Sequence, residues 1–294
     1  MIVSASYRTD IPAFYGDWFR RRLQAGFAQV ANPYGGPSYR VPLDAGQATA
    51  FVFWTRNVLP FLPVLRQLAA ADRPFVVQYT ATGYPRALEE RVPDMAQAVA
   101  GIRAVAEQFG RNVAVWRYDP ILLSDLTPAE FHRRRFAELA AALQGSVNEV
   151  VASYLSPYRK TTRNLAAAAS RHRFAWRPAG PAEMAELLAD LEPIAARHGM
   201  LLTWCSQPDL GGRPARCIDV RRLSAVAGRT IAAPQKGNRP GCDCALSRDI
   251  GAYDSCPHGC VYCYAVANRA GALARYRRHD PASAGLGPPS RSPT

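Results

Sequence analysis

The stretch "FVVQYTATGYPRALEERVPDMAQAVAGIRAVAEQFGRNVAVWRYD" (residues 75–119) decides the expected fold. It opens with a run rich in β-branched and aromatic residues (75–82), which predicts a buried strand. Apolar residues then recur at helical spacing up to a glycine (92–110), and a second strand-like run follows (113–119). A strand, a helix and a further strand in this order predict two parallel strands joined by a right-handed crossover.

The same alternation extends over most of the chain. Apolar runs typical of buried strands occupy residues 1–6, 27–32, 49–55, 75–82, 113–119, 148–155 and 199–206. Helical patterns occupy residues 12–26, 59–72, 92–110, 127–145 and 181–199. Seven parallel strands alternating with helices favour an α/β fold of the (β/α) TIM-like barrel type over an open sheet. The pattern leaves room for an irregular or incomplete barrel, because the connection over 33–48 has no helical pattern and the best candidate for an eighth strand is the short run 229–234.

The chain is expected to divide into three segments. Residues 1–234 are predicted to form the barrel, and residues 235–268 a cysteine-rich segment packed on it. Residues 269–294 are basic and end in a stretch rich in Pro, Ser and Gly, which predicts a disordered tail.

Composition narrows the class of protein. The chain has 294 residues and a formal net charge of +13, but of its 36 basic residues only Lys160 and Lys236 are lysine. Such a general replacement of lysine by arginine indicates a composition bias, so much of the charge is interpreted as solvated surface, and a nucleic-acid partner is kept as an alternative.

The location of the protein is predicted from what the sequence lacks. No run of 18 apolar residues is present, so no membrane span is expected, and the N-terminus has no secretory pattern. A cytoplasmic location follows, and in a reducing compartment the seven cysteines are expected to be metal ligands or redox groups.

Polar residues follow several of the predicted strands. In a (β/α) barrel the carboxyl ends of the strands carry the active site. The residues predicted to be catalytic, sharing one cavity, are Arg8, Asp10, Arg117 and Asp119. Those predicted to bind an anionic small molecule or a nucleotide-like group are Arg56, Asn57, Arg159 and Lys160. The alternative is structural, with Arg117 paired to Asp119 or Asp10 at a polar end of the barrel.

The stretch "DSCPHGCVYCYA" (254–265) places Cys256, Cys260 and Cys263 in the pattern C-x3-C-x2-C. Three thiolates on one short loop can hold three corners of a 4Fe–4S cluster and leave one iron open. The alternative is a structural zinc ion, which needs a fourth ligand such as His258 or Cys244.

Four further cysteines lie outside this pattern. Cys205 ends the last predicted strand, Cys217 follows it, and Cys242 and Cys244 form C-x-C. These four thiols could ligate a second cluster or a zinc ion, or they could be ordinary buried thiols.

Two resemblances bear on the cysteines. The C-x3-C-x2-C pattern with an aromatic residue before the last cysteine is similar to the cluster site of the radical S-adenosylmethionine enzymes, where the open iron binds S-adenosylmethionine. In those enzymes the pattern lies near the N-terminus, whereas here it lies near the C-terminus. More widely, the chain resembles the domain of unknown function 1848 family; the matching stretches are 4–19, 51–57, 116–123, 158–164 and 242–265. This resemblance implies that Cys256, Cys260 and Cys263 are the cluster ligands.

The expected function is that of an iron–sulfur protein. It is predicted to be a redox or radical S-adenosylmethionine-like enzyme that acts on an anionic small molecule at the barrel mouth and receives electrons from a donor. The alternatives are a repair-type nucleic-acid-binding protein with a structural cluster and a zinc-stabilised hydrolase.

Overall fold

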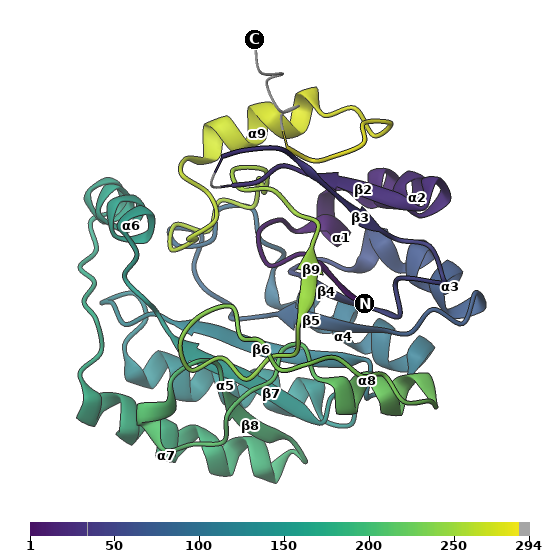
Figure 1. Cartoon of the computed structure of the whole chain (residues 1–294). Helices are drawn as coiled ribbons and strands as arrows, with labels where there is room; N and C mark the ends of the chain where they lie inside the picture. Colours follow the sequence, from purple (N-terminus) through teal and green to yellow (C-terminus); the bar gives the residue numbers. More distant parts are fainter. Residues whose placement is uncertain (34, 288–294) are drawn as a thin grey trace.

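The computed structural model describes residues 1–33 and 35–287, and its centre is one parallel sheet. The sheet has seven strands in the order β8-β7-β6-β5-β4-β1-β9, and every neighbouring pair is parallel (Figure 1). The strands are β1 (Ile2–Ala5), β4 (Ala50–Thr55), β5 (Phe75–Thr80), β6 (Ala114–Ile121), β7 (Glu149–Tyr154), β8 (Leu201–Trp204) and β9 (Ser247–Asp249). The predicted α/β fold with a parallel sheet is therefore confirmed.

Helices surround the sheet. They are α1 (Ile11–Phe14), α2 (Gly16–Ala25), α3 (Leu62–Ala70), α4 (Met95–Phe109), α5 (Ala129–Leu143), α6 (Arg159–His172), α7 (Pro181–Arg197), α8 (Val220–Ala227) and α9 (Arg269–Arg278). Short 3-10 turns, η1 (Leu59–Phe61) and η2 (Pro208–Leu210), complete the set for the described residues.

The two faces of the sheet carry separate cores because successive residues of a strand point to opposite faces. On the outer face, large aromatic residues such as Phe53 and Trp116 pack with the helices in the main core. On the inner face, small aliphatic residues such as Val52 and Val115 pack with Leu223 of α8 in a second core. Helix α8 thus fills the inner side of the curved sheet and leaves its carboxyl end to polar residues.

Strands β8 and β9 are the two edges of the sheet, and no pairing between them occurs among residues 1–33 and 35–287. An irregular segment, residues 213–218, lies between the edges. Its Ala215 N–H donates to Trp204 O in β8 (2.8 Å), and its Ile218 O accepts from Ala245 N–H (3.0 Å), two residues before β9. The gap between the edges is therefore bridged by backbone contacts but not by a regular strand.

The expected eighth strand over 229–234 is wrong. In place of strand pairing, Ile231 N–H donates to Ser224 Oγ in α8 (2.9 Å). The run is apolar because Ile231 is buried in the inner core, and burial alone produced the strand-like pattern.

The run 27–32 was also misplaced by the sequence pattern. It contains β2 (Phe27–Val30), but β2 pairs antiparallel with β3 (Tyr39–Pro42) in a separate two-stranded sheet. The connection over 33–48 thus contains a strand that its mixed composition did not indicate.

The prediction of a disordered tail over 269–294 is wrong for residues 269–287, and residues 288–294 lie outside the described part of the chain. Helix α9 begins at the Asn268 cap, and its Tyr276 ring packs against Phe14 and Tyr15 at 5.4 and 5.5 Å. Beyond α9, Ser283 O accepts from Trp18 Nε1 (3.0 Å). In Figure 1 this segment covers the top of the molecule beside β2 and β3.

A search of the described residues finds no helix whose length and apolar character would allow it to cross a membrane.

Candidate functional site

The loop that carries Cys256, Cys260 and Cys263 lies against the carboxyl ends of β1 and β5. Next to the first cysteine, Ser255 Oγ is 2.7 Å from Thr9 Oγ1, just after β1, and Ser255 O accepts from Tyr15 OH (2.6 Å). On the side of β5, Leu88 O accepts from Val261 N–H (3.1 Å). The loop is thus held at both ends by residues that follow strands.

Asp10 is the main anchor between β1, β4 and the cysteine loop. Its carboxylate accepts hydrogen bonds from Thr55 Oγ1 (2.7 Å) and Arg56 N–H (2.7 Å) and lies 2.8 Å from His258 Nε2. The other ring nitrogen of His258 lies 3.4 Å from Arg91 O. Because both ring nitrogens have partners, His258 positions the loop and is not free to ligate a metal in this geometry.

A second buried anchor joins β4 and β5 to the loop. Arg56 Nη1 lies 2.7 Å from Glu89 Oε1, and Arg56 Nη2 donates to Tyr262 OH (2.6 Å). Glu89 also accepts from Thr82 Oγ1 (2.7 Å) and from Tyr262 OH. The Arg56–Glu89 pair is almost inaccessible, with side-chain exposures of 10% and 4%. Arg56 is therefore engaged in a structural ion pair, and its guanidinium is not available to bind a substrate.

The three thiols of the loop are free and only partly covered. Burial raises the pKa of Cys256, and the neighbouring charges of Asp10, Cys263 and Cys260 raise it further. Burial also raises the pKa of Cys260, to about 12, although the Arg56 guanidinium opposes the shift. Each of the other two thiols therefore lies close enough to Cys256 to influence its charge.

Gly259 shapes the loop between Cys256 and Cys260. Its φ of +79° is in the left-handed region, and a Cβ at this position would meet Arg269 Cδ at 2.5 Å. Only glycine adopts this backbone conformation without strain and leaves the Arg269 side chain in its place.

Arg8, predicted to be catalytic, is engaged in a buried pair with a residue that the sequence analysis did not single out. Its guanidinium lies 2.8 Å from Asp249 at the end of β9, with exposures of 6% and 3%. Ser6 Oγ (2.9 Å) and Tyr7 N–H (3.1 Å) also donate to Asp249. Burial raises the pKa of Asp249, and Arg8 counteracts the shift.

Arg117 and Asp119 form a second buried pair on the inner face of β6. The Arg117 guanidinium donates to Asp119, which also accepts from Ser153 on β7. Burial would raise the pKa of Asp119, but Arg117 and Ser153 outweigh it and lower the pKa. Arg117 Nη1 also points at Cys217 Sγ, 2.8 Å away.

The four predicted catalytic residues thus belong to three networks: Arg8 with Asp249, Asp10 with His258, and Arg117 with Asp119. The pairing of Arg117 with Asp119 is the structural alternative named above. Tyr264 OH donates to Tyr7 O beside the Arg8–Asp249 pair; burial raises the pKa of Tyr264, and the neighbouring charges of Cys263 and Asp249 raise it further.

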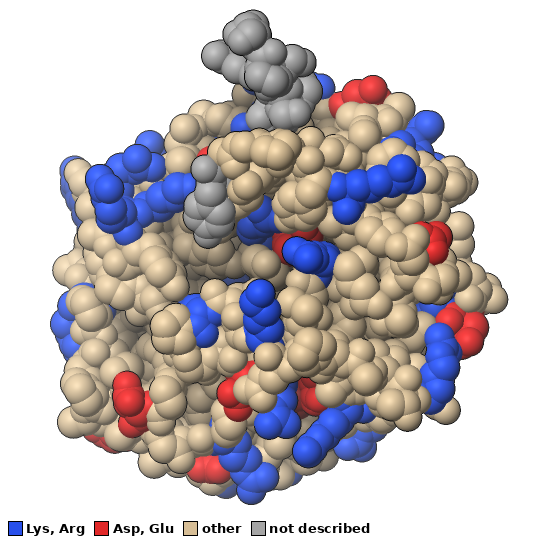
Figure 2. Space-filling model, in the orientation of Figure 1, with Lys and Arg blue, Asp and Glu red and all other residues tan. Residues whose placement is uncertain are grey.

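Tyr264 is one of the large exposed aromatic residues, at 42%. Figure 2 shows a hollow near the centre of this face, between α6 and β9, bordered by Lys and Arg side chains. The Tyr158 ring lies 6.1 Å from the Tyr264 ring, and Lys160 Nζ lies 5.0 Å from the centre of the Tyr253 ring.

The other predicted substrate-binding residues have different surroundings. Asn57 Oδ1 accepts from Leu59 N–H (3.3 Å) and so caps a local turn. Arg159 and Lys160 begin helix α6, which the sequence analysis did not predict; Arg159 is exposed and Lys160 is half-buried. Lys160 is close enough to Cys263 to lower the pKa of that thiol, though burial raises it overall.

The remaining four thiols come together away from the loop. Cys205 Sγ lies 3.9 Å from Cys217 Sγ. Interaction with Cys205 lowers the pKa of Cys217, but interaction with Cys244 and burial raise it to about 11. Interaction with Cys244 is also the main reason why the pKa of Cys242 is lowered to about 6. In the part of the chain that the structure describes, no three or more His, Cys, Asp or Glu side chains stand in a ready-made metal-binding arrangement.

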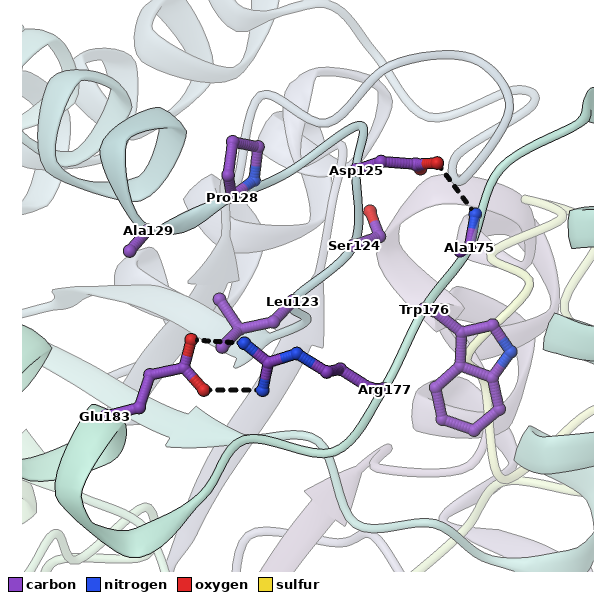
Figure 3. Close-up of a pocket in the computed structure, with 9 residues that line it drawn as sticks. All are labelled: Leu123, Ser124, Asp125, Pro128, Ala129, Ala175, Trp176, Arg177 and Glu183. Carbon is purple, nitrogen blue, oxygen red and sulfur yellow. Dashed lines mark hydrogen bonds and ion pairs between the residues drawn. The ribbon is translucent and has the colours of Figure 1, made fainter.

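A separate cavity of about 320 Å³ lies between the loop after β6 and the start of α7 (Figure 3). It is lined by Leu123, Ser124 and Trp176, and an exposed ion pair between Arg177 and Glu183 (2.7 Å) crosses one side. None of the predicted site residues lines it.

The fold and these side chains define an α/β protein with a parallel sheet and two sets of thiols, one on a loop at the carboxyl ends of β1 and β5 and one between the edge strands β8 and β9. The chain belongs to the family described as Domain of unknown function (DUF1848), which it matches over residues 2–265. No curated protein matches the chain.

Among solved structures, the chain is similar to a "putative alpha-L-fucosidase" from Bacteroides thetaiotaomicron at 10% identity, with 79% of this chain and 84% of that chain covered. The TM-score of 0.28 is too low to carry an argument about fold or activity.

Proposed function

We propose that the protein is an iron–sulfur enzyme in which Cys256, Cys260 and Cys263 hold a 4Fe–4S cluster with one iron left open to a ligand. The observation that carries the proposal is the gathering of three free thiols on one loop, anchored to β1, β4 and β5 by Asp10 and Glu89. Such a cluster supplies electron transfer or, with S-adenosylmethionine on the open iron, radical chemistry.

The contacts of the two candidate fourth ligands favour the cluster over zinc. A structural zinc ion needs four protein ligands. Both ring nitrogens of His258 have partners, and Cys244 interacts with Cys217 and Cys242 in the other set of thiols. With neither candidate available as a fourth ligand, the three thiolates are what a 4Fe–4S cluster with one open iron requires.

A group of basic and tyrosine side chains near the start of α6 suits an anionic, flat ligand. Within residues 1–33 and 35–287, neither Lys160 nor Arg239 forms an ion pair with a carboxylate, in contrast to Arg8, Arg56 and Arg117. Arg239 Nη1 instead lies 3.5 Å from Tyr158 OH. Two cations without carboxylate partners beside tyrosine rings favour a phosphate or carboxylate attached to a ring system, such as a nucleotide-like group.

A reducing compartment fits this chemistry. All seven cysteines are free thiols, the form in which they can serve as ligands.

Two measurements on anaerobically purified protein test the proposal. Charge-transfer absorption of thiolate-bound iron is expected, and a colourless protein without iron would contradict the cluster. Reduced protein incubated with S-adenosylmethionine is expected to release 5′-deoxyadenosine. An intact, reduced cluster that releases none would remove the radical chemistry and leave a redox enzyme.

The ligand class is tested with a nucleoside monophosphate as the probe. Lys160→Met is expected to weaken its binding by about tenfold, since one charge-assisted contact is lost. Arg159→Met is the matched control, because Arg159 is the neighbouring cation at the start of α6 and its side chain is exposed. Equal losses in the two variants would show a general charge effect and refute the assignment of Lys160.

A further inference from the structure

The second set of thiols lies where the sheet has its two edges. Cys205 directly follows β8, Cys217 lies on the bridging segment 213–218, and Cys242 and Cys244 directly precede β9. Backbone hydrogen bonds already join these three parts of the chain, from Trp204 to the bridging segment and from the bridging segment to Ala245. The four thiols therefore mark the junction of three segments that share no regular strand pairing.

The four sulfur atoms form a chain of neighbours. Cys205 contacts Cys217, Cys217 interacts with Cys244, and Cys244 interacts with Cys242. Cys205, Cys217 and Cys244 are buried, with exposures of 9%, 7% and 3%, whereas Cys242 is half-buried. Cys205, Cys217 and Cys244 belong to the same inner core, and Cys242 packs against it.

We infer that Cys205, Cys217, Cys242 and Cys244 bind a single tetrahedral zinc ion that closes the gap between β8 and β9. Four thiolates at a zinc–sulfur distance of roughly 2.3 Å stand about 3.8 Å apart along each edge of the tetrahedron. The distance of 3.9 Å between Cys205 Sγ and Cys217 Sγ matches this edge. In a 4Fe–4S cluster each thiolate binds a different iron, so the sulfur atoms stand farther apart than on one ion.

The surroundings of the sulfur atoms are those of metal-bound thiolates. After the larger effect of the Cys244 thiol, the nearby backbone N–H groups of Asn238 and Cys244 lower the pKa of Cys242, and that of Ile218 acts in the same direction on the pKa of Cys244. Such donors orient the ligands and offset their charge.

Two guanidinium groups extend this set of donors. Arg117 Nη1 lies 2.8 Å from Cys217 Sγ, and Arg239 Nη2 lies 3.5 Å from Cys205 Sγ. A zinc ion with four thiolates carries two net negative charges, and Arg239 offsets part of this charge; Arg117 contributes less, because it is also paired with Asp119.

The backbone around the C-x-C pair is shaped for this close approach. A Cβ on Gly237 would meet Cys242 O at 2.1 Å, and Gly241 has a φ of +70°. Glycine is thus required on both sides of the turn that brings Cys242 and Cys244 to the bridging segment. The zinc ion would crosslink β8, the segment 213–218 and the start of β9, in place of an eighth strand.

The test is the metal content of the full-length protein, with zinc and iron measured separately. The wild type is expected to hold about one zinc ion per chain. Cys217→Ser and Cys242→Ser should each lose at least about tenfold in zinc and keep their iron. Cys260→Ser is the matched control, which should lose iron and keep zinc. The proposed function and this inference therefore fail independently.

Three outcomes would overturn the zinc site. One is zinc that remains at the wild-type level in Cys217→Ser. Another is iron that survives the loss of Cys256, Cys260 and Cys263 but disappears in Cys217→Ser. The third is a Cys205–Cys217 disulfide in zinc-free wild-type protein. Because Cys242 is half-buried, Cys242→Ser is the variant that folds most readily, and cobalt added to zinc-free wild-type protein should give the absorption of tetrahedral thiolate-bound cobalt as an independent readout.

Discussion

Replacement of Glu89 by glutamine should destabilise the protein through the charge that it leaves behind. Glu89 Oε1 lies 2.7 Å from Arg56 Nη1, and the two side chains are 4% and 10% exposed. In Glu89→Gln the Arg56 guanidinium stays buried without a carboxylate. Removal of one partner of a buried pair costs about 3–5 kcal/mol. Because Arg56 keeps its hydrogen bond to Tyr262 OH, the expected loss is at the lower end of this range, about 3 kcal/mol.

The assay is the midpoint of thermal unfolding, with Glu90→Gln as the matched control. For a chain of 294 residues, a loss of about 3 kcal/mol should lower the midpoint by roughly 5 °C. Glu90 is the next residue and also pairs with an arginine, Arg269, at 2.6 Å, but its side chain is 50% exposed. The loss of an exposed pair contributes about 0–1 kcal/mol, so the control should barely change.

A double variant separates charge from packing. In Arg56→Met with Glu89→Leu both charges are absent, so it should recover most of the stability lost in Glu89→Gln. The reasoning is refuted if Glu89→Gln and Glu90→Gln lower the midpoint equally, or if the double variant is less stable than Glu89→Gln.

Three further predictions concern the rest of the fold. Burial lowers the pKa of His132 from 6.5 to about 4, so the stability due to its neutral form is present above pH 6.5 and is lost as the pH falls towards 4. Over this range the wild type should lose about 3 kcal/mol more than His132→Gln, and parallel pH profiles in urea unfolding would contradict this. Gly259→Ala should cost more than Gly228→Ala in the same assay, because both have a positive φ but only at Gly259 would a Cβ meet a neighbour, at 2.5 Å; equal costs would count against the steric argument. Leu223→Ala in α8 should cost about 2–5 kcal/mol because Leu223 is fully buried in the inner core, and a loss under about 1 kcal/mol would show that α8 does not fill the sheet.

Local sequence patterns predicted the parallel sheet because six of its seven strands are apolar runs. The exception is β9, Ser247–Asp249, whose polar residues carry no strand pattern; its conformation depends on pairing with β1. Helix α9 was missed for a similar reason, since its arginine-rich sequence shows little amphipathic pattern and it is held by Tyr276 against α1 and by its Asn268 cap.

The candidate site was predictable only where it is local. The spacing of Cys256, Cys260 and Cys263 within one loop is visible in the sequence. The buried partners around it are not, because Glu89, which holds the loop, is 173 positions from Tyr262, and Asp249, which pairs with Arg8, is 241 positions from it. The residues next to Glu89 and Asp249 in the sequence form no motif, so neither residue was predicted.

The central claim is tested most directly by iron and sulfide counts on anaerobically purified protein in which Cys256, Cys260 and Cys263 are all changed to alanine. The wild type should hold about four iron atoms per chain and the triple variant almost none. Iron retained by the triple variant at the wild-type level would contradict the assignment of these three cysteines as the cluster ligands.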